Sequence, residues 1–195
     1  ARMQCGIAVV PTAPERVRNR DSEYLYRYDS YFYYLCGFQE PEAVLVLIAG
    51  TEAQSILFCR EKNPERETWD GFRYGPEAAR EAYGVDAAYP MAQLDEKLVA
   101  LMANQPALYY APGMDAHWDE RIMGWLNQVR AQSRTGVSAP QHIHDVRAAL
   151  DEMRLVKDEH ELALMRSAAG ISAKAHERAM RATRPGRMEY EIEAE

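Results

Sequence analysis

Residues 42–60 read EAVLVLIAGTEAQSILFCR, in which two β-rich runs stand on either side of a short polar segment. The first run is apolar at every position from 43 to 49, which predicts a strand buried on both faces in the middle of a sheet. The segment Gly50-Thr51-Glu52-Ala53 suits a hairpin turn, and residues 54–60 supply the second strand. This stretch therefore predicts the centre of a β-sheet.

Further strands and helices alternate on both sides of this hairpin. Residues 5–11 and 107–111 are short β-rich runs and predict two more strands. Helical spacing of apolar residues predicts helices over 76–83 and 91–104, followed by a third helix that Asp115 caps. Strands that alternate with helices of this length are typical of α/β domains. We therefore predict an α/β fold with a mixed β-sheet flanked by helices.

Two aromatic segments fit this pattern less directly. Residues 31–35 follow a polar loop over 12–21 and alternate poorly, so we interpret them as a half-buried strand whose rings pack on both sides. Trp69 lies in the stretch ETWDGFRYG (67–75), whose two glycines predict a loop. Aromatic residues on loops often make contacts with ligands or partners. Trp69 is therefore either a contact residue or an ordinary structural tryptophan.

The last third of the sequence has a helical pattern. Residues 145–153 and 158–183 predict two helices, and Arg184-Pro185-Gly186 ends the second. A new acidic amphipathic segment begins at Met188, a few residues before Glu195. A helix start of that length cannot overcome its nucleation cost alone, so we expect the sequence to be cut at this point.

The charge balance argues against several classes of function. The chain has 23 Lys and Arg against 30 Asp and Glu, a formal net charge of −7, and contains no basic block. Binding to nucleic acid or to an anionic membrane is therefore disfavoured, and the longest apolar run, 43–49, is too short to cross a bilayer. Three cysteines without CxxC spacing predict buried thiols in a reducing compartment. No signal peptide is visible, so we expect a cytoplasmic protein.

Established catalytic motifs are absent from the sequence, including HExxH, GxGxxG, GxxxxGK[ST] and GxSxG. His142 and His144 form an HxH pair that could bind zinc from one face of a strand, but no third ligand lies at a characteristic spacing. We interpret the pair as surface or capping histidines. The many carboxylates leave a metal-dependent nuclease open, which would require a carboxylate cluster at strand ends and a basic groove.

Four segments, in order, resemble the N-terminal half of aminopeptidase P. Residues 21–43 (DSEYLYRYDSYFYYLCGFQEPEA) are similar to the family pattern DSEYxYRxxSxFxYLTGFxEPEA, and residues 69–75 (WDGFRYG) to WxGxRxG. The third segment is Ser138-Ala139-Pro140 after Ser133-Arg134. The fourth is 153–162 (MRLVKDEHEL), which is similar to MRLxKxxxEI and is shared with prolidase and creatinase. The first segment is the most specific, and the presence of Cys36 where threonine is commoner does not challenge the resemblance.

The resemblance implies an RNase H-like N-terminal domain over 1–152, followed by the first helix of a truncated pita-bread catalytic domain over 153–195. Family members hold two metal ions, usually manganese, and remove the N-terminal residue from peptides with proline in second position. They assemble as homodimers or homotetramers. Their metal ligands match no residue here, so the resemblance implies no catalytic or metal-binding residue in this chain and no activity of this polypeptide alone.

The resemblance also implies three residues that border the active site of a neighbouring subunit. They are Asp21 of the DSEY segment, Trp69 as an apolar wall against the peptide substrate, and Arg134, which together with Asp21 forms an ionic rim. Three other interpretations stay open: a non-catalytic binding module of the same two-domain origin, a prolidase, and the nuclease considered above.

Overall fold

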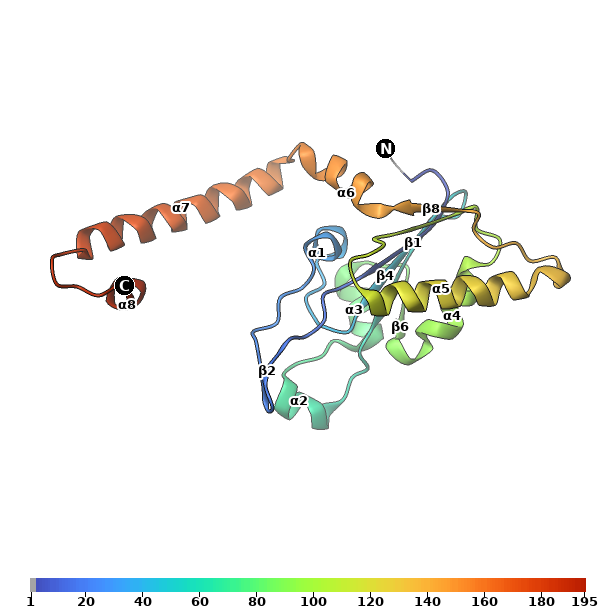
Figure 1. The fold of residues 1–195 in the computed structure, drawn as a ribbon, viewed down its shortest axis with the longest axis horizontal. Helices are drawn as coiled ribbons and strands as arrows, with labels where there is room; N and C mark the ends of the chain where they lie inside the picture. The colour runs from blue at the N-terminus through green and yellow to red at the C-terminus, as the bar shows by residue number, and fades with distance from the viewer. Residues whose placement is uncertain (1–2) are drawn as a thin grey trace. The chain divides into compact units, whose positions relative to one another are not determined.

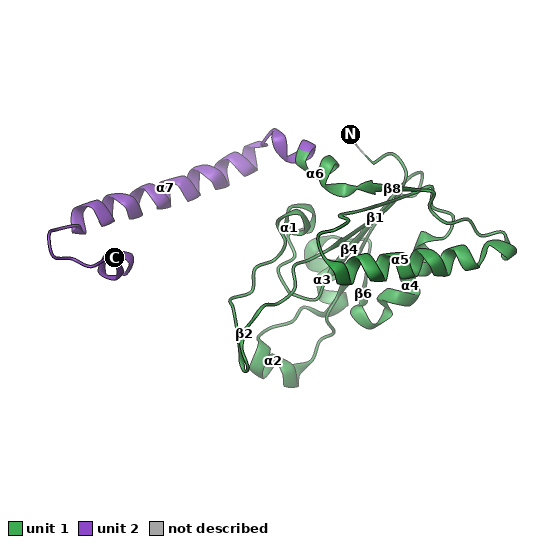
Figure 2. Ribbon diagram, in the orientation of Figure 1, with its two compact units in different colours: residues 1–151 green, residues 152–195 purple. Residues whose placement is uncertain are grey.

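The computed structural model describes residues 3–195 and separates them into two units (Figure 2). The first unit ends at Asp151 and contains the β-sheet, whereas the second comprises Glu152–Glu195 and is helical.

A six-stranded mixed sheet forms the centre of the first unit (Figure 1). Its order is β6-β5-β4-β1-β7-β8. Strand β4 is antiparallel to both of its neighbours, while the other adjacent pairs are parallel. The predicted hairpin is confirmed, since β4 and β5 pair across the turn and β4 lies inside the sheet. The strands are β1 (Gly6–Pro11), β4 (Val44–Ala49), β5 (Gln54–Cys59), β6 (Ala87–Pro90), β7 (Ala107–Tyr110) and β8 (His142–Asp145).

Helices cover both faces of this sheet. Successive side chains of a strand point to opposite faces, so Val9 packs into one core cluster and Val10 into the other. The Val9 face is covered by η1 (Met91–Gln93), α4 (Leu94–Met102) and α5 (Ala116–Ala131); the Val10 face by α1 (Ser30–Cys36), α3 (Gly75–Tyr83) and α6 (Val146–Leu155). The predicted fold class, a mixed sheet flanked by helices, is confirmed.

The interpretation of residues 31–35 as a strand is wrong, because this segment is helix α1. Asp29 caps the helix: its Oδ1 accepts hydrogen bonds of 2.9 Å from the backbone N–H groups of Tyr31 and Phe32. Gly37 ends it by donating its N–H to the Tyr33 carbonyl. Phe32 is the buried residue of this helix, which explains the poor alternation.

Two further expectations need correction. The segment 12–21 is not wholly loop, because β2 (Val17–Asn19) pairs with β3 (Ser22–Glu23) in a small exposed hairpin. The prediction of three buried thiols holds for Cys59, whereas Cys36 is half-buried and Cys5 is exposed. All three cysteines are free.

The second unit contains the end of α6, then α7 (Glu159–Ala182) and α8 (Glu189–Glu193). Helix α7 begins with a capping box, in which Asp158 accepts from the Glu161 N–H and Glu161 accepts from the Asp158 N–H. The two predicted helices of the last third are confirmed. Among residues 3–195, no helix combines the length and the apolar character that a membrane span requires.

Candidate functional site

The three site residues predicted from the sequence lie at two different edges of the sheet. We call the edge where β1, β5, β6, β7 and β8 end the carboxyl edge. Asp21, in the β2–β3 turn, follows β1, and Trp69, in α2 (Pro64–Asp70), follows β5, so both come from the carboxyl edge. Arg134 lies in η2 (Ser133–Thr135), after α5 has run back toward the start of β8 (Figure 1).

The β2–β3 hairpin and α2 lie near each other at the carboxyl edge. Glu15, which precedes the hairpin, is influenced by the charges of both Glu23 in β3 and Asp70 in α2. Burial, followed by the neighbouring Glu23 charge, raises the pKa of Glu15 above its ordinary value. A helix of 16 residues such as α5 is about 24 Å long, so Arg134 is remote from this pair within one chain. The structure thus brings Asp21 and Trp69 to one edge and Arg134 to the other.

Trp69 was predicted to lie in a loop, but this prediction is wrong, because Trp69 lies in helix α2 with its side chain exposed. Asn63 caps α2 by accepting the Arg66 N–H at 3.0 Å, and Pro64 occupies the first turn. The Trp69 side chain is 84% exposed, and α2 has no buried residue. The alternative that Trp69 is an ordinary structural tryptophan therefore has no support from burial.

The segment after Trp69 turns sharply and is fixed by polar contacts. We call residues 62–75 the Trp69 turn. Gly71 has φ 83° and ψ −178°, a conformation that is almost exclusive to glycine. Glu67 Oε1 accepts from Lys62 Nζ at 2.6 Å and from the Arg73 N–H at 2.7 Å, and Lys62 Nζ also donates to the Arg73 carbonyl at 2.8 Å. The hydrogen bonds that Glu67 accepts from Lys62 and from the Arg73 N–H hold the Glu67 pKa below its ordinary value.

A buried ion pair anchors the Trp69 turn to the domain. The Arg60 and Glu40 side chains are 9% and 11% exposed, and Arg60 Nη2 lies 3.5 Å from Glu40 Oε2. The other oxygen, Glu40 Oε1, accepts the Tyr74 N–H at 2.7 Å. Tyr74 in turn packs edge-on against Phe72 and Tyr83. Glu40 thus joins the segment after α1 to the end of the Trp69 turn.

A cavity of about 220 Å³ lies at the carboxyl edge beside β1 and β7. Its walls are largely apolar, with Pro11, Tyr110 and Trp118 among them. The two carboxylates in its lining have structural roles, because Asp29 caps α1 and Asp115 caps α5 by accepting the His117 N–H at 2.8 Å. We therefore find no pair of carboxylates poised for acid–base chemistry in this cavity.

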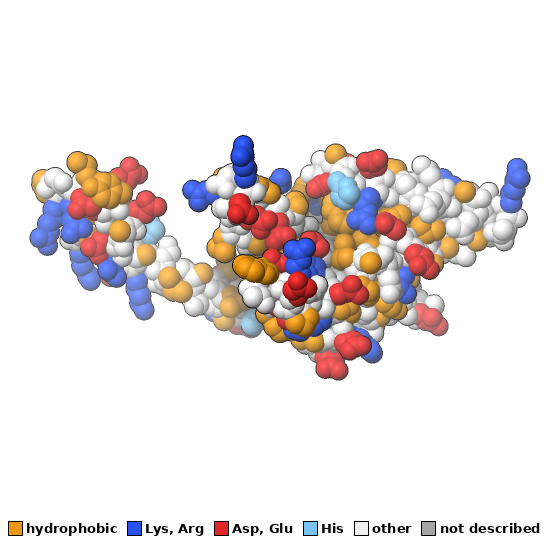
Figure 3. All heavy atoms as spheres, turned by 90° about the horizontal axis from the view of Figure 1, so that it is seen from below, with side chains coloured by type: hydrophobic (Ala, Val, Ile, Leu, Met, Phe, Trp, Pro, Cys, Tyr) orange, Lys and Arg blue, Asp and Glu red, His pale blue; other side chains and the backbone are white. Residues whose placement is uncertain are grey.

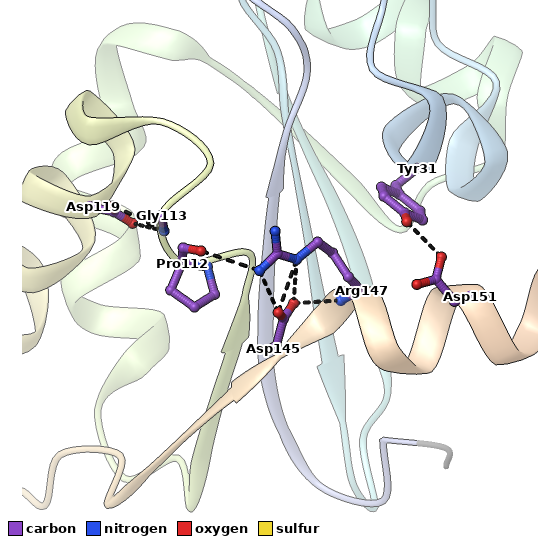
Figure 4. A network of polar contacts seen from close by, with 7 residues as sticks. All are labelled: Tyr31, Pro112, Gly113, Asp119, Asp145, Arg147 and Asp151. Carbon is purple, nitrogen blue, oxygen red and sulfur yellow. Dashed lines mark hydrogen bonds and ion pairs between the residues drawn. The ribbon is translucent and has the colours of Figure 1, made fainter.

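A polar network beside this cavity fixes the end of β8 (Figure 4). Arg147 Nε donates to both Asp145 oxygens, at 2.8 and 2.9 Å, and Arg147 Nη2 donates to the Pro112 carbonyl at 3.3 Å. The Arg147 contacts lower the Asp145 pKa. In the same view, the Tyr31 hydroxyl donates to Asp151 at 2.6 Å and connects α1 with α6. These contacts position helices and strands, and a catalytic arrangement is not among them.

The HxH pair lies on an exposed edge strand, as its interpretation as surface histidines predicts. The rings of His142 and His144 are 6.1 Å apart, and His144 stacks on Tyr109 at 4.8 Å. Within residues 3–195, no group of three or more His, Cys, Asp or Glu residues could hold a metal ion. The same result leaves the nuclease interpretation without the carboxylate cluster that it requires. Figure 3 shows acidic, basic and hydrophobic side chains interspersed on the face in view.

Sequence reasoning missed the charged residues that shape the Trp69 turn: Lys62, Glu67, Glu40 and Arg60. The Asn63-Pro64 pair is a recognisable helix start and could have indicated α2. The contacts of Glu67 with Arg73 and of Glu40 with Arg60 depend on how the turn folds back, and they follow no helical or strand spacing.

Comparisons with known proteins identify relatives of this chain. The family model described as "Aminopeptidase P, N-terminal domain" matches residues 1–109. The Xaa-Pro aminopeptidase of Escherichia coli strain K12 is 42% identical over 197 residues, which cover 100% of this chain and 45% of that protein. The chain therefore spans less than half the length of this curated relative.

Solved structures give the same result. Zinc-substituted E. coli aminopeptidase P in complex with product superimposes with a TM-score of 0.95 at 42% identity, over 99% of this chain and 44% of that chain. The aminopeptidase PepP of Pseudomonas aeruginosa superimposes with a TM-score of 0.94 at 45% identity, over 98% of this chain and 43% of that chain.

Proposed function

The chain belongs to the aminopeptidase P family through its N-terminal domain, and from this premise we propose that it is the N-terminal part of an Xaa-Pro aminopeptidase. Such an enzyme removes the N-terminal residue from peptides that have proline in second position. The observation that carries this proposal is the 42% identity to an Xaa-Pro aminopeptidase over the whole chain. The tests below also distinguish this enzyme from a binding module or a prolidase of the same origin.

The chemistry of hydrolysis is assigned to a part of the enzyme outside residues 1–195. A matched relative is described as zinc-substituted and in complex with product, which supports a metal-dependent reaction, with two manganese ions as the expected native metals. Residues 3–195 do not fit such a site, because no group of three or more of their His, Cys, Asp or Glu side chains could hold a metal ion. In this proposal, the catalytic residues and the metal ligands of the enzyme lie outside this chain.

The role assigned to this domain is control of substrate access, together with assembly into a homodimer or homotetramer. Trp69 forms an apolar wall at the active site of a neighbouring subunit, and its exposure on a fixed turn supports that role. Asp21 and Arg134 contribute to an ionic rim. Because these two residues lie at opposite edges of one domain, a rim that contains both draws them from different copies of the chain, or from a site that spans both edges.

Two experiments test this proposal. Purified residues 1–195, incubated with Mn²⁺ and an Xaa-Pro peptide, should release no free amino acid above a metal-only blank, whereas the full-length gene product should release the N-terminal residue. Turnover by residues 1–195 contradicts the assignment of chemistry to another part of the polypeptide. Inactivity of the metal-loaded full-length protein supports a non-catalytic binding module, and activity restricted to dipeptides supports a prolidase.

The access role has its own test. In the full-length enzyme, Trp69→Ala should impair turnover of longer Xaa-Pro peptides more than turnover of short ones. Unchanged kinetics on the longer peptides would remove the role assigned to Trp69. We expect the full-length protein to lie in the cytoplasm. Cell fractionation tests this expectation.

A further inference from the structure

Burial holds the end of the Trp69 turn at Tyr74 and Gly75, but it does not hold the part that carries Trp69 and Phe72. Helix α2 has no buried residue, and the Trp69 and Phe72 side chains are mostly exposed. An exposed segment with few buried apolar contacts opens at little cost in free energy unless other interactions fix it. A contact surface for a peptide needs a defined orientation, because ordering side chains on binding weakens affinity.

Glu67 and Lys62 hold the peptide units on both sides of one residue. Glu67 Oε1 accepts the Arg73 N–H at 2.7 Å, and Lys62 Nζ donates to the Arg73 carbonyl at 2.8 Å. The two side chains also bind each other at 2.6 Å. Each of these hydrogen bonds has at least one charged partner, and such bonds are stronger than those between neutral groups. The backbone at Arg73 is therefore clamped from its amino and its carbonyl side.

The clamp extends to the aromatic residues of the turn. Lys62 Nζ lies 4.0 Å from the centre of the Phe72 ring, within the range of a cation–π contact. The Arg73 guanidinium donates to Asp70, the residue after Trp69, at 2.7 Å. A Cβ atom at Gly75 would lie 3.1 Å from the backbone nitrogen of Lys62, so the turn closes tightly on this lysine. Both Trp69 and Phe72 are thus tied to the position of Arg73.

We propose that Glu67 and Lys62 are positioning residues, which clamp the backbone at Arg73 and so hold Trp69 and Phe72 in one orientation for contact with the substrate peptide. The role of the contact surface rests on the proposed function. The clamp itself is a property of this chain and is tested without the activity of the enzyme.

The direct test is ¹⁹F NMR of residues 1–195 labelled with 5-fluorotryptophan. The chain has three tryptophans, and the Trp69 signal is assigned by its loss in Trp69→Phe. In Glu67→Ala the Trp69 signal should move toward the shift of free fluorotryptophan and sharpen, with a smaller change in Lys62→Met and in Glu67→Gln. The signals of Trp118 and the buried Trp125 should stay in place.

Matched variants make the test decisive. Glu65→Ala removes an exposed carboxylate from the same helix and should leave the Trp69 signal unchanged. The proposal is overturned if Glu67→Ala also leaves the Trp69 signal unchanged. It is equally overturned if the signals of all three tryptophans move together, since Glu67 would then support the fold in general.

A kinetic test connects the clamp with the substrate. In the full-length enzyme, Glu67→Ala should raise KM for a longer Xaa-Pro peptide by about the same factor as Trp69→Ala, on the order of tenfold, with little change in kcat. The double variant should show no further loss, because both changes remove one interaction. If Trp69→Ala has no kinetic effect, the assigned contact role fails, while the NMR result still decides whether Glu67 and Lys62 orient the turn.

Discussion

Phe32 and Phe38 are completely buried, whereas Trp69 and Phe72 expose 84% and 64% of their surface in a neighbouring part of the same domain. The first pair meets edge-on, with ring centres 6.5 Å apart, and packs into the core on the Val10 face of the sheet. The second pair stands on a turn whose shape depends on charged hydrogen bonds. Different forces therefore fix the two pairs: packing holds Phe32 and Phe38, and polar contacts hold the turn that carries Trp69 and Phe72.

The largest expected effect is on the buried side of this comparison. Phe32→Ala should lower the free energy of unfolding by about 3–5 kcal/mol, because it leaves a cavity where the ring packs against Phe38. Urea denaturation followed by far-UV circular dichroism measures the loss. Tyr33→Ala, at the next and more exposed position, should cost about 1 kcal/mol. Equal losses at both positions would mean that burial does not distinguish them.

The next effect concerns Glu40, which connects the two regions. Glu40→Ala should cost about 3 kcal/mol, because it leaves the buried Arg60 guanidinium unpaired and the Tyr74 N–H without its acceptor. The double variant Glu40→Ala/Arg60→Met should recover part of this loss, since it removes the unpaired charge as well. Urea denaturation of both variants provides the measurement, and a double variant that is less stable than Glu40→Ala would contradict this account.

The core of this domain could be predicted from the sequence because its signals are local. The apolar run 43–49 and the Gly50 turn specified β4 and β5, and the Asp115 cap specified the start of α5. Helix α1 was missed because its aromatic content favoured a strand. Asp29 and Gly37, which stand at its two ends, were the available signals for a helix.

The site could be predicted only in part, for a physical reason. The resemblance drew attention to Trp69, but its helical setting and exposure were not evident from its neighbours. The residues that orient it interact through space: Glu67 reaches Arg73 only because Gly71 reverses the chain between them. The distance in space between Asp21 and Arg134 could not be predicted from the sequence around them, because it depends on the length and direction of α5.

A smaller effect is expected at Gly75, where the Trp69 turn closes on the backbone of Lys62. Gly75 has φ 70°, and an added Cβ would approach Lys62 at 3.1 Å, so Gly75→Ala should cost about 2–3 kcal/mol. Gly84 also has a positive φ, of 65°, but it faces open space, so Gly84→Ala should cost about 1 kcal/mol. The difference between the two losses, from urea denaturation, isolates the close approach. Identical losses would show that the contact with Lys62 is unimportant.

Acid should loosen the Trp69 turn before it affects the buried aromatic pair. The Glu67 pKa is lowered in the folded chain by Lys62 and Arg73, from an ordinary value of 4.5. The ionised form therefore stabilises the turn fully above pH 4.5, and this contribution is lost as the pH falls through the lowered pKa. The ¹⁹F signal of Trp69 should shift in that window while circular dichroism is still that of the folded protein. In Glu67→Gln this step should be absent, and its persistence would assign it to another carboxylate.

The smallest effect on stability is expected at the residue with the most specific proposed role. Trp69→Ala should change the free energy of unfolding by less than about 0.5 kcal/mol, because the side chain leaves almost no packing behind. Trp125→Ala provides the contrast: its ring is buried and its Nε1 donates to Asp95 at 2.8 Å, so the loss should be about 3–5 kcal/mol. A large loss in Trp69→Ala would make this tryptophan part of the fold. A loss near zero means that the domain exposes a large apolar ring without any gain in stability, as the proposed contact role of Trp69 requires.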